Sequence, residues 1–157
     1  MKILVTGGTG FTGALLVSRL LDMGHIVRSL DNQPGIFYDE LKEKGAELIT
    51  GSVTDRQVVM DATQGMEFVF HLAAAFRKLN APNSYYYDVN VSGTRYVLEA
   101  ADACNVQKVV YCSTQGVHGH VKNPPGNEDS PIAPADYYQQ TKYEGEEVTQ
   151  EFIRKGM

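Results

Sequence analysis

The sequence predicts an α/β protein built on a doubly wound parallel sheet of about five strands. Three observations predict this class: short apolar runs alternate with helix-like segments, a glycine-rich turn directly follows the first run, and the first two helix-like segments end at glycines. Strands that are separated by helices of this length pair in parallel through right-handed crossovers. Because the chain has no repeat, low-complexity segment or internal boundary, we expect one domain over residues 1–157.

The first half of the chain supplies three of the expected strands. Glycine readily adopts the left-handed conformation that ends a helix, so Gly24 and Gly45 mark two helix ends. The expected elements are a strand at 2–6, a helix that follows the glycine turn and ends before Gly24, a strand at 26–30, a short helix at 39–44 and a strand at 46–50.

The second half of the chain supplies two more strands and the longer helices. Thr54 or Asp55 is placed to cap the first of these helices. Residues 116–135 are rich in Pro, Gly, Asn and Asp, which is the composition of a loop. The expected elements are a helix at 55–64, a strand at 68–72, one long helix at 84–104, a strand at 108–112 and a final helix at 136–155.

Composition excludes several functional classes. With 14 Lys and Arg against 19 Asp and Glu, the net charge is -5, and no basic cluster offers a nucleic-acid footprint. The apolar run at 14–23 is interrupted by Arg19 and Asp22, so we expect neither a signal peptide nor a membrane span. Cys104 and Cys112 form no CxxC pair, which indicates reduced thiols, a cytoplasmic protein and no metal site.

The glycine turn at residues 7–13 predicts a phosphate site. Glycines let a ligand approach the backbone, and the N–H groups of the following helix attract an anion. A dinucleotide pyrophosphate is therefore the expected ligand. A glycine-rich turn without a ligand is the alternative. Asp31 lies 18 residues after Gly13, where a carboxylate accepts ribose hydroxyls and repels a 2′-phosphate. NAD is therefore preferred over NADP, unless Asp31 only opens a turn with Asn32 and Pro34.

The last helix carries a second candidate site, Tyr138 and Lys142. Residues four apart share a helix face, so the ammonium lies near the phenol and favours its ionised form. A tyrosine needs this help because its ordinary pKa is about 10. The spacing also occurs on ordinary surface helices. Its meaning here comes from Ser113 and Thr114, which follow the fifth strand and offer hydroxyls to a substrate oxygen.

Together these motifs resemble an extended short-chain dehydrogenase/reductase, the NAD-dependent epimerase/dehydratase family, over the whole chain. The matching segments are residues 6–13, 31–32, 71–74, 90–94, 110–114 and 128–131, with Tyr138 and Lys142. The resemblance implies a Rossmann fold.

The resemblance also implies site residues. The cofactor-binding set is Gly7, Gly10, Phe11, Thr12 and Gly13 at the pyrophosphate, Asp31 and Asn32 at the ribose, Ser52 and Val53 at the adenine, Leu72, Ala73 and Ala74 along the cofactor, and Ser113, Tyr138 and Lys142 toward the nicotinamide. The catalytic set is Thr114 at the family's Ser/Thr position, Tyr138 as general acid/base, Lys142 as the group that lowers the tyrosine pKa and holds the nicotinamide ribose, and Asn90 in a structural role beside them.

Three departures from the family pattern stand out. Ser52 replaces an Asp that contacts adenine, so that contact falls to the backbone or to the Ser52 hydroxyl. His118 replaces a common tyrosine, and we favour a loop role for it over a substrate contact. The chain ends at Met157, before the family's substrate domain, so we expect an N-terminal portion of a longer enzyme with its fifth strand at a sheet edge.

These observations leave three activities open. The first is Tyr-assisted, NAD-dependent epimerisation, dehydration or oxidation of a nucleotide-sugar. The second is reduction of a 3β-hydroxysteroid or dihydroflavonol-like ketone, and the third is a non-catalytic NAD-binding module. The resemblance also implies a homodimer through the helices that carry Asn90 and Tyr138.

Overall fold

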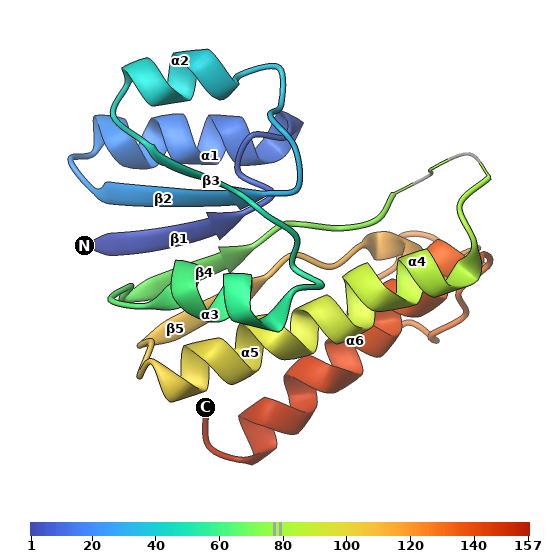
Figure 1. The fold of residues 1–157 in the computed structure, drawn as a ribbon. Helices are drawn as coiled ribbons and strands as arrows, with labels where there is room; N and C mark the ends of the chain where they lie inside the picture. The colour runs from blue at the N-terminus through green and yellow to red at the C-terminus, as the bar shows by residue number, and fades with distance from the viewer. Residues whose placement is uncertain (77, 79) are drawn as a thin grey trace.

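A five-stranded parallel sheet forms the centre of the computed structural model, which describes residues 1–76, 78 and 80–157 (Figure 1). The strand order is β3-β2-β1-β4-β5. The strands are β1 (Lys2–Thr6), β2 (Ile26–Asp31), β3 (Glu47–Thr50), β4 (Phe68–His71) and β5 (Lys108–Tyr111). The α-helices are α1 (Phe11–Asp22), α2 (Tyr38–Glu43), α3 (Arg56–Thr63), α4 (Asn83–Tyr87), α5 (Gly93–Ala103) and α6 (Tyr137–Arg154). The predicted fold class and element order are confirmed.

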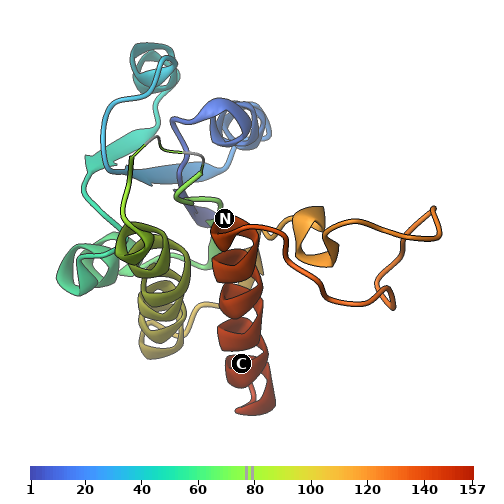
Figure 2. The same cartoon turned by 90° about the vertical axis from the view of Figure 1, so that its right-hand side faces the viewer.

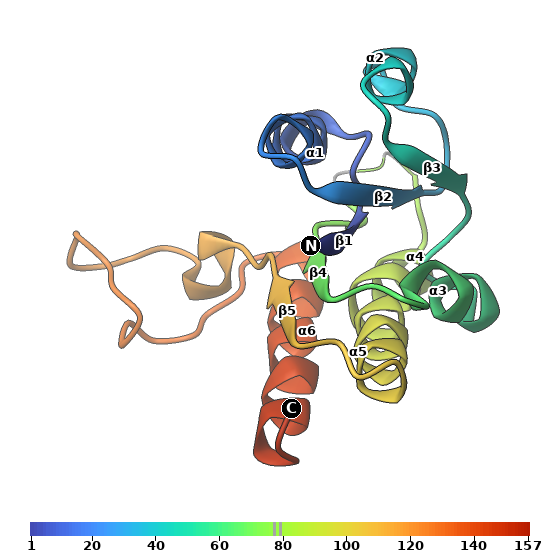
Figure 3. The same ribbon diagram turned by 90° about the vertical axis from the view of Figure 1, so that its left-hand side faces the viewer.

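Helices cover both faces of the sheet, and β1 shows why. Successive strand residues point to opposite faces, so Ile3 and Val5 pack with α1 and α2, whereas Leu4 packs with α3 and α5. Figures 1 and 3 show α1 and α2 on one side of the sheet and α3, α5 and α6 on the other. Each face is buried, and the chain places a hydrophobic core on each side of one sheet.

Helix ends follow the expected signals. The Asp55 carboxylate accepts from the N–H groups of Gln57 and Val58 at the start of α3, and Asp136 does the same for Gln139 at the start of α6. Gly24 follows α1 with a φ of 79°, as predicted for a left-handed helix end. Of the two residues proposed to cap α3, Asp55 is the cap.

One predicted element differs in detail. The long helix expected at 84–104 is divided by a π-helical turn, η1 (Asp88–Ser92), between α4 and α5. A π turn contains one residue more than an α turn, and its wider ring redirects the side chains inside it. Val89, Asn90 and Val91 are all buried in this turn. The apolar spacing of the sequence could not distinguish a π turn from continuous α-helix.

The segment after β5 projects from the body of the molecule. It begins with a short 3-10 helix, η2 (Gln115–His118), and residues 119–136 then form an extended loop beside α6 (Figure 2). In the described part of the chain, β5 pairs with β4 alone and is the sheet edge that the sequence predicted.

His71, the last residue of β4, is fully buried. It belongs to a series of hydrogen-bonded polar side chains that runs from β1 to α5. Its Nδ1 lies 2.7 Å from the Thr6 hydroxyl and its Nε2 lies 3.1 Å from the Thr94 hydroxyl. Thr94 donates its single proton to the Asn90 carbonyl, so His71 must donate from Nε2 and accept at Nδ1. Burial, assisted by the Lys142 charge, lowers the His71 pKa to about 3.

Replacing His71 by Gln should change how stability depends on pH. Below pH 6.5 the unfolded chain binds a proton at His71 that the folded chain rejects down to about pH 3, so wild-type stability falls as pH falls through this range. We expect the stability difference between wild type and H71Q, measured by urea unfolding, to narrow by up to about 1.4 kcal/mol per pH unit from pH 6.5 downward. A constant difference across this range would contradict a buried neutral imidazole.

Candidate active site

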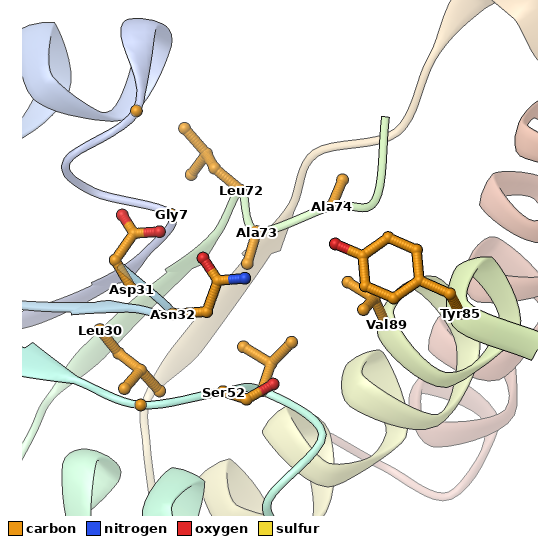
Figure 4. A pocket seen from close by; sticks show the side chains of 13 residues that line it. Gly7, Leu30, Asp31, Asn32, Ser52, Leu72, Ala73, Ala74, Tyr85 and Val89 are labelled. Carbon is orange, nitrogen blue, oxygen red and sulfur yellow. The ribbon is translucent and has the colours of Figure 1, made fainter. Parts of the chain in front are cut away.

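A pocket of about 200 Å³ opens where β1, β2 and β4 end (Figure 4). In parallel α/β sheets, ligands bind beyond the carboxyl ends of the strands. The pocket is lined by Gly7, Gly10, Leu30, Asp31, Asn32, Gly51, Ser52, Val53, Leu72, Ala73, Ala74, Tyr85 and Val89. Nine of these were predicted as cofactor-binding residues, namely Gly7, Gly10, Asp31, Asn32, Ser52, Val53, Leu72, Ala73 and Ala74.

The backbone of the glycine turn forms one wall of this pocket through Gly7 and Gly10. Gly7 has a φ of 72°, and its N–H donates to the Leu30 carbonyl at 2.8 Å. A Cβ at Gly13 would overlap the Gly7 carbonyl oxygen, so only glycine allows α1 to start this close to the turn. Gly10 caps α1 without a side-chain hydrogen bond. The first N–H groups of α1 are thus available to an anion.

Asp31 reaches the pocket from the end of β2. Its Oδ2 accepts two hydrogen bonds from Thr9, one from the backbone N–H and one from the hydroxyl, each 2.8 Å long. Figure 4 shows the carboxylate pointing toward the glycine turn, with Asn32 beside it. An anionic group at this position accepts hydroxyl donors and repels phosphate.

The rest of the pocket lining includes Ser52, which was expected, and two residues that the sequence did not point to. The Ser52 hydroxyl lies 2.8 Å from the Thr54 hydroxyl and accepts the Thr54 N–H at 3.1 Å. Tyr85 of α4 and Val89 of η1 face Ser52 and Asn32 across the pocket (Figure 4). A signal existed, because Tyr85 and Val89 are four residues apart and share a helix face.

Lys142 forms the centre of a second cluster on α6. The side chain is 3% exposed, its Nζ donates to the Cys112 carbonyl at 2.7 Å, and it lies 4.3 Å above the centre of the Tyr111 ring. The Tyr111 hydroxyl donates in turn to the Lys142 carbonyl at 3.1 Å. Burial lowers the Lys142 pKa to about 8. Tyr111 lies in the matching segment at 110–114, but no role was predicted for it.

Ser113 and Thr114 lie between the end of β5 and the start of η2. The Thr114 hydroxyl accepts the Gly116 N–H at 3.1 Å, which caps η2. The Ser113 hydroxyl donates to the Glu146 carboxylate on α6, one turn beyond Lys142. Burial, with the Glu146 charge, raises the pKa of the Tyr111 phenol, so Tyr111 stays a neutral donor.

Asn90 joins the segment after β4, which lines the pocket, to α6. Its Oδ1 accepts the Ala75 N–H at 2.8 Å, and its Nδ2 donates to the Ala75 carbonyl at 3.2 Å and to the Thr141 hydroxyl at 3.0 Å. Thr141 donates to the Tyr138 carbonyl at 3.0 Å. The buried amide therefore fixes the segment after β4 relative to the first turn of α6.

Eight predicted site residues do not line the pocket. Three lie in the first turn of α1, and the other five lie around Lys142 and on the helices beside it: Phe11, Thr12, Gly13, Asn90, Ser113, Thr114, Tyr138 and Lys142. Phe11 is 80% exposed at the start of α1. His118 occupies the projecting loop, where its Nδ1 lies 3.0 Å from the Ser130 carbonyl oxygen.

Comparison with known proteins agrees with this geometry. The sequence model of the NAD-dependent epimerase/dehydratase family matches residues 3–157. The chain belongs to this family. Its pocket and glycine turn are those of a Rossmann domain, and NAD is the cofactor of the family. Several solved structures that share the fold contain NAD.

Three relatives illustrate the range of the family. The N-acetyl-alpha-D-glucosaminyl-diphospho-ditrans,octacis-undecaprenol 4-epimerase of Escherichia coli O157:H7 is 36% identical over 98% of this chain and 44% of its own length. A 3 beta-hydroxysteroid dehydrogenase/Delta 5-->4-isomerase of Mycobacterium tuberculosis is 37% identical over 74% of this chain and 32% of its own. The dTDP-glucose 4,6-dehydratase of Streptomyces venezuelae, solved with NAD bound, superposes with a TM-score of 0.90 at 27% identity over 98% and 52% of the two chains. The chain thus spans about a third to a half of these relatives.

The described residues fit the adenosine half of NAD. The uncapped first turn of α1 offers N–H groups to a pyrophosphate. The Asp31 carboxylate, on the pocket wall, offers an acceptor to a ribose. Among the residues described, no three His, Cys, Asp or Glu side chains converge on a possible metal position. No helix within that part of the chain combines the length and apolar character needed to span a bilayer.

Replacing Lys142 by Met should stabilise the protein at neutral pH. The lowered pKa means that the fold disfavours the charged ammonium, and an apolar side chain of similar length removes this penalty. We expect K142M to gain about 1–3 kcal/mol at pH 7 in urea unfolding.

The gain should shrink as pH rises from 8 toward 10.5, because the folded lysine loses its proton first and the wild type is then relieved of the same penalty. A variant that is destabilised at pH 7 would contradict this account.

Proposed function

We propose that this chain binds NAD in the pocket at the ends of β1, β2 and β4 and forms the cofactor-binding half of an epimerase or dehydratase that acts on a nucleotide-sugar. The observation that carries the proposal is the buried Lys142 on α6, one turn after Tyr138. Asn90 bonds the neighbouring Thr141 of the same helix to Ala75, which directly follows the pocket-lining Ala74. A buried ammonium that costs stability is typical of a residue kept for chemistry.

Each residue of the catalytic set has a definite task in this proposal. NAD, bound in this pocket, would supply the hydride acceptor and donor for the reaction. Tyr138 takes the substrate hydroxyl proton at its phenolic oxygen and later gives it back. The Lys142 ammonium favours the ionised phenol that accepts this proton. The Thr114 hydroxyl donates to the same substrate oxygen, while its own oxygen is oriented by the Gly116 N–H.

The substrate class is proposed from the relatives. Two of them act, by name, on a sugar that carries a diphosphate: one on an undecaprenol-linked diphosphate sugar and one on dTDP-glucose. A 3β-hydroxysteroid-type reductase is the second candidate, because a steroid dehydrogenase is 37% identical over 74% of the chain. Both reactions exchange a hydride and a proton at a secondary alcohol, so the same three side chains serve either one.

We further propose a cytoplasmic homodimer. Cys104 and Cys112 are free thiols, as suits a reducing compartment. A groove between the α4-to-α5 helix and α6 contains Arg95 and Arg154 together with Glu144 and Glu147. In a twofold-symmetric dimer this groove faces the same groove of the second protomer. Because the groove carries both positive and negative side chains, the two copies can pair opposite charges.

Replacing Tyr138 by Phe tests the catalytic proposal. We expect Y138F to lose at least about 100-fold in turnover, because the proton acceptor is removed, while calorimetry gives the same affinity for NAD. Turnover is measured by NADH absorbance and product chromatography with UDP-glucose, UDP-N-acetylglucosamine and a 3β-hydroxysteroid.

Unchanged turnover in Y138F would contradict the assigned role. NAD binding by the wild type that none of these substrates changes would favour the third activity, a non-catalytic NAD-binding module.

Replacing Tyr87 by Glu tests the dimer. Tyr87 lines the groove and is 45% exposed in the single chain. An added carboxylate in the groove that also holds Glu144 and Glu147 should add like charge facing its symmetric copy, and light scattering should then give the monomer mass. Lys108→Glu, on the β5 edge away from this groove, is the control and should stay dimeric.

A further inference from the structure

Thr9 lies inside the glycine turn and is 3% exposed. Its hydroxyl donates to Asp31 Oδ2 at 2.8 Å and accepts the Gly35 N–H at 3.1 Å. Its backbone N–H donates to the same Asp31 oxygen, also at 2.8 Å. One side chain therefore connects the glycine turn, the carboxylate at the end of β2 and the loop that follows β2.

The two bonds to Asp31 restrict the carboxylate. Because both end on Oδ2, rotation about the Asp31 side-chain bonds would break two charge-assisted hydrogen bonds at once. The same bonds occupy Oδ2, while Asp31 lines the pocket. An acceptor that is fixed before binding loses little conformational freedom when a ligand arrives.

Gly35 makes this arrangement possible. A Cβ at Gly35 would overlap the Thr9 carbonyl oxygen, so the loop after β2 approaches the glycine turn more closely than any larger residue allows. The Gly35 N–H completes the hydroxyl's hydrogen bonding, because a hydroxyl has one proton to donate and accepts with its lone pairs. The hydroxyl is thus held in the orientation that directs its proton to Asp31.

We propose that Thr9 is a positioning residue for cofactor selection, which orients the Asp31 carboxylate toward the adenosine ribose hydroxyls of NAD. This inference rests on the proposed function, since it assigns a role within the proposed NAD site. It predicts an energetic coupling between the Thr9 hydroxyl and the ribose 2′-hydroxyl. A Thr9 that only ties the loop to the turn has no such coupling.

The experiment compares two ligands on four proteins. Wild type, Thr9→Ser, Thr9→Val and Thr9→Ala are titrated by calorimetry with NAD and with the NAD analogue that lacks the adenosine 2′-hydroxyl. We expect T9V and T9A to weaken NAD binding about tenfold, the effect of losing one charge-assisted hydrogen bond, and to weaken analogue binding less than about threefold. T9S keeps the hydroxyl and should bind both ligands like the wild type.

Each outcome decides the inference. An equal loss for NAD and the analogue in T9V and T9A would overturn it and leave Thr9 a structural residue. Thermal unfolding by circular dichroism identifies a variant that fails to fold, and T9A replaces T9V in that case because alanine is smaller than threonine. A wild-type chain that binds NAD no better than the 2′-deoxy analogue would also overturn it. A wild type that binds neither ligand would contradict the proposed function itself.

Discussion

The side-chain amide of Asn90 is the interaction on which both halves of the site depend. A buried amide must be hydrogen-bonded, because leaving its donors or acceptor unpaired costs about 1–3 kcal/mol each. Asn90 meets this requirement by bonding to both peptide groups of Ala75 and to Thr141. The segment that leaves β4 and the helix that carries Tyr138 are therefore held by one residue, and neither can shift without breaking its hydrogen bonds.

The series of hydrogen-bonded polar side chains that ends at Asn90 begins at Thr6 in β1, the strand that leads into the glycine turn. Thr6 bonds to His71, His71 bonds to Thr94, and Thr94 donates to the Asn90 carbonyl. The Thr6 hydroxyl also accepts the N–H of Ala73, which lines the pocket. Such a chain adds rigidity only when every member is satisfied. Lys142 is different, because its burial opposes its charge. The fold thus combines this fully hydrogen-bonded chain of side chains with a buried lysine that it holds at a cost.

The sequence predicted the fold because its signals are local. Apolar runs, helix-ending glycines and the Asp55 cap each act within a few residues. Nine pocket residues were predicted, some from the glycine turn and Asp31 and the rest from the family resemblance, and all follow strand ends, which meet at one edge of a parallel sheet. Tyr85, Val89 and the Ser113–Glu146 pair were not, since their contacts depend on how helices pack against distant strands. The π turn also escaped prediction, because an apolar pattern does not record one additional residue in a turn.

That additional residue determines how the helix responds to changes of length. A π turn takes up one more residue than an α turn, so deleting one residue between Tyr87 and Gly93 would convert η1 to an α turn and leave α4 close to its present orientation relative to α5. Tyr85 would stay on the pocket wall, while the buried side chains inside the turn, Asn90 among them, would be displaced. Inserting one more residue has no such compensation, because an α-helix turns by about 100° per residue: α4 would rotate by about that angle, and Tyr85 would leave the pocket.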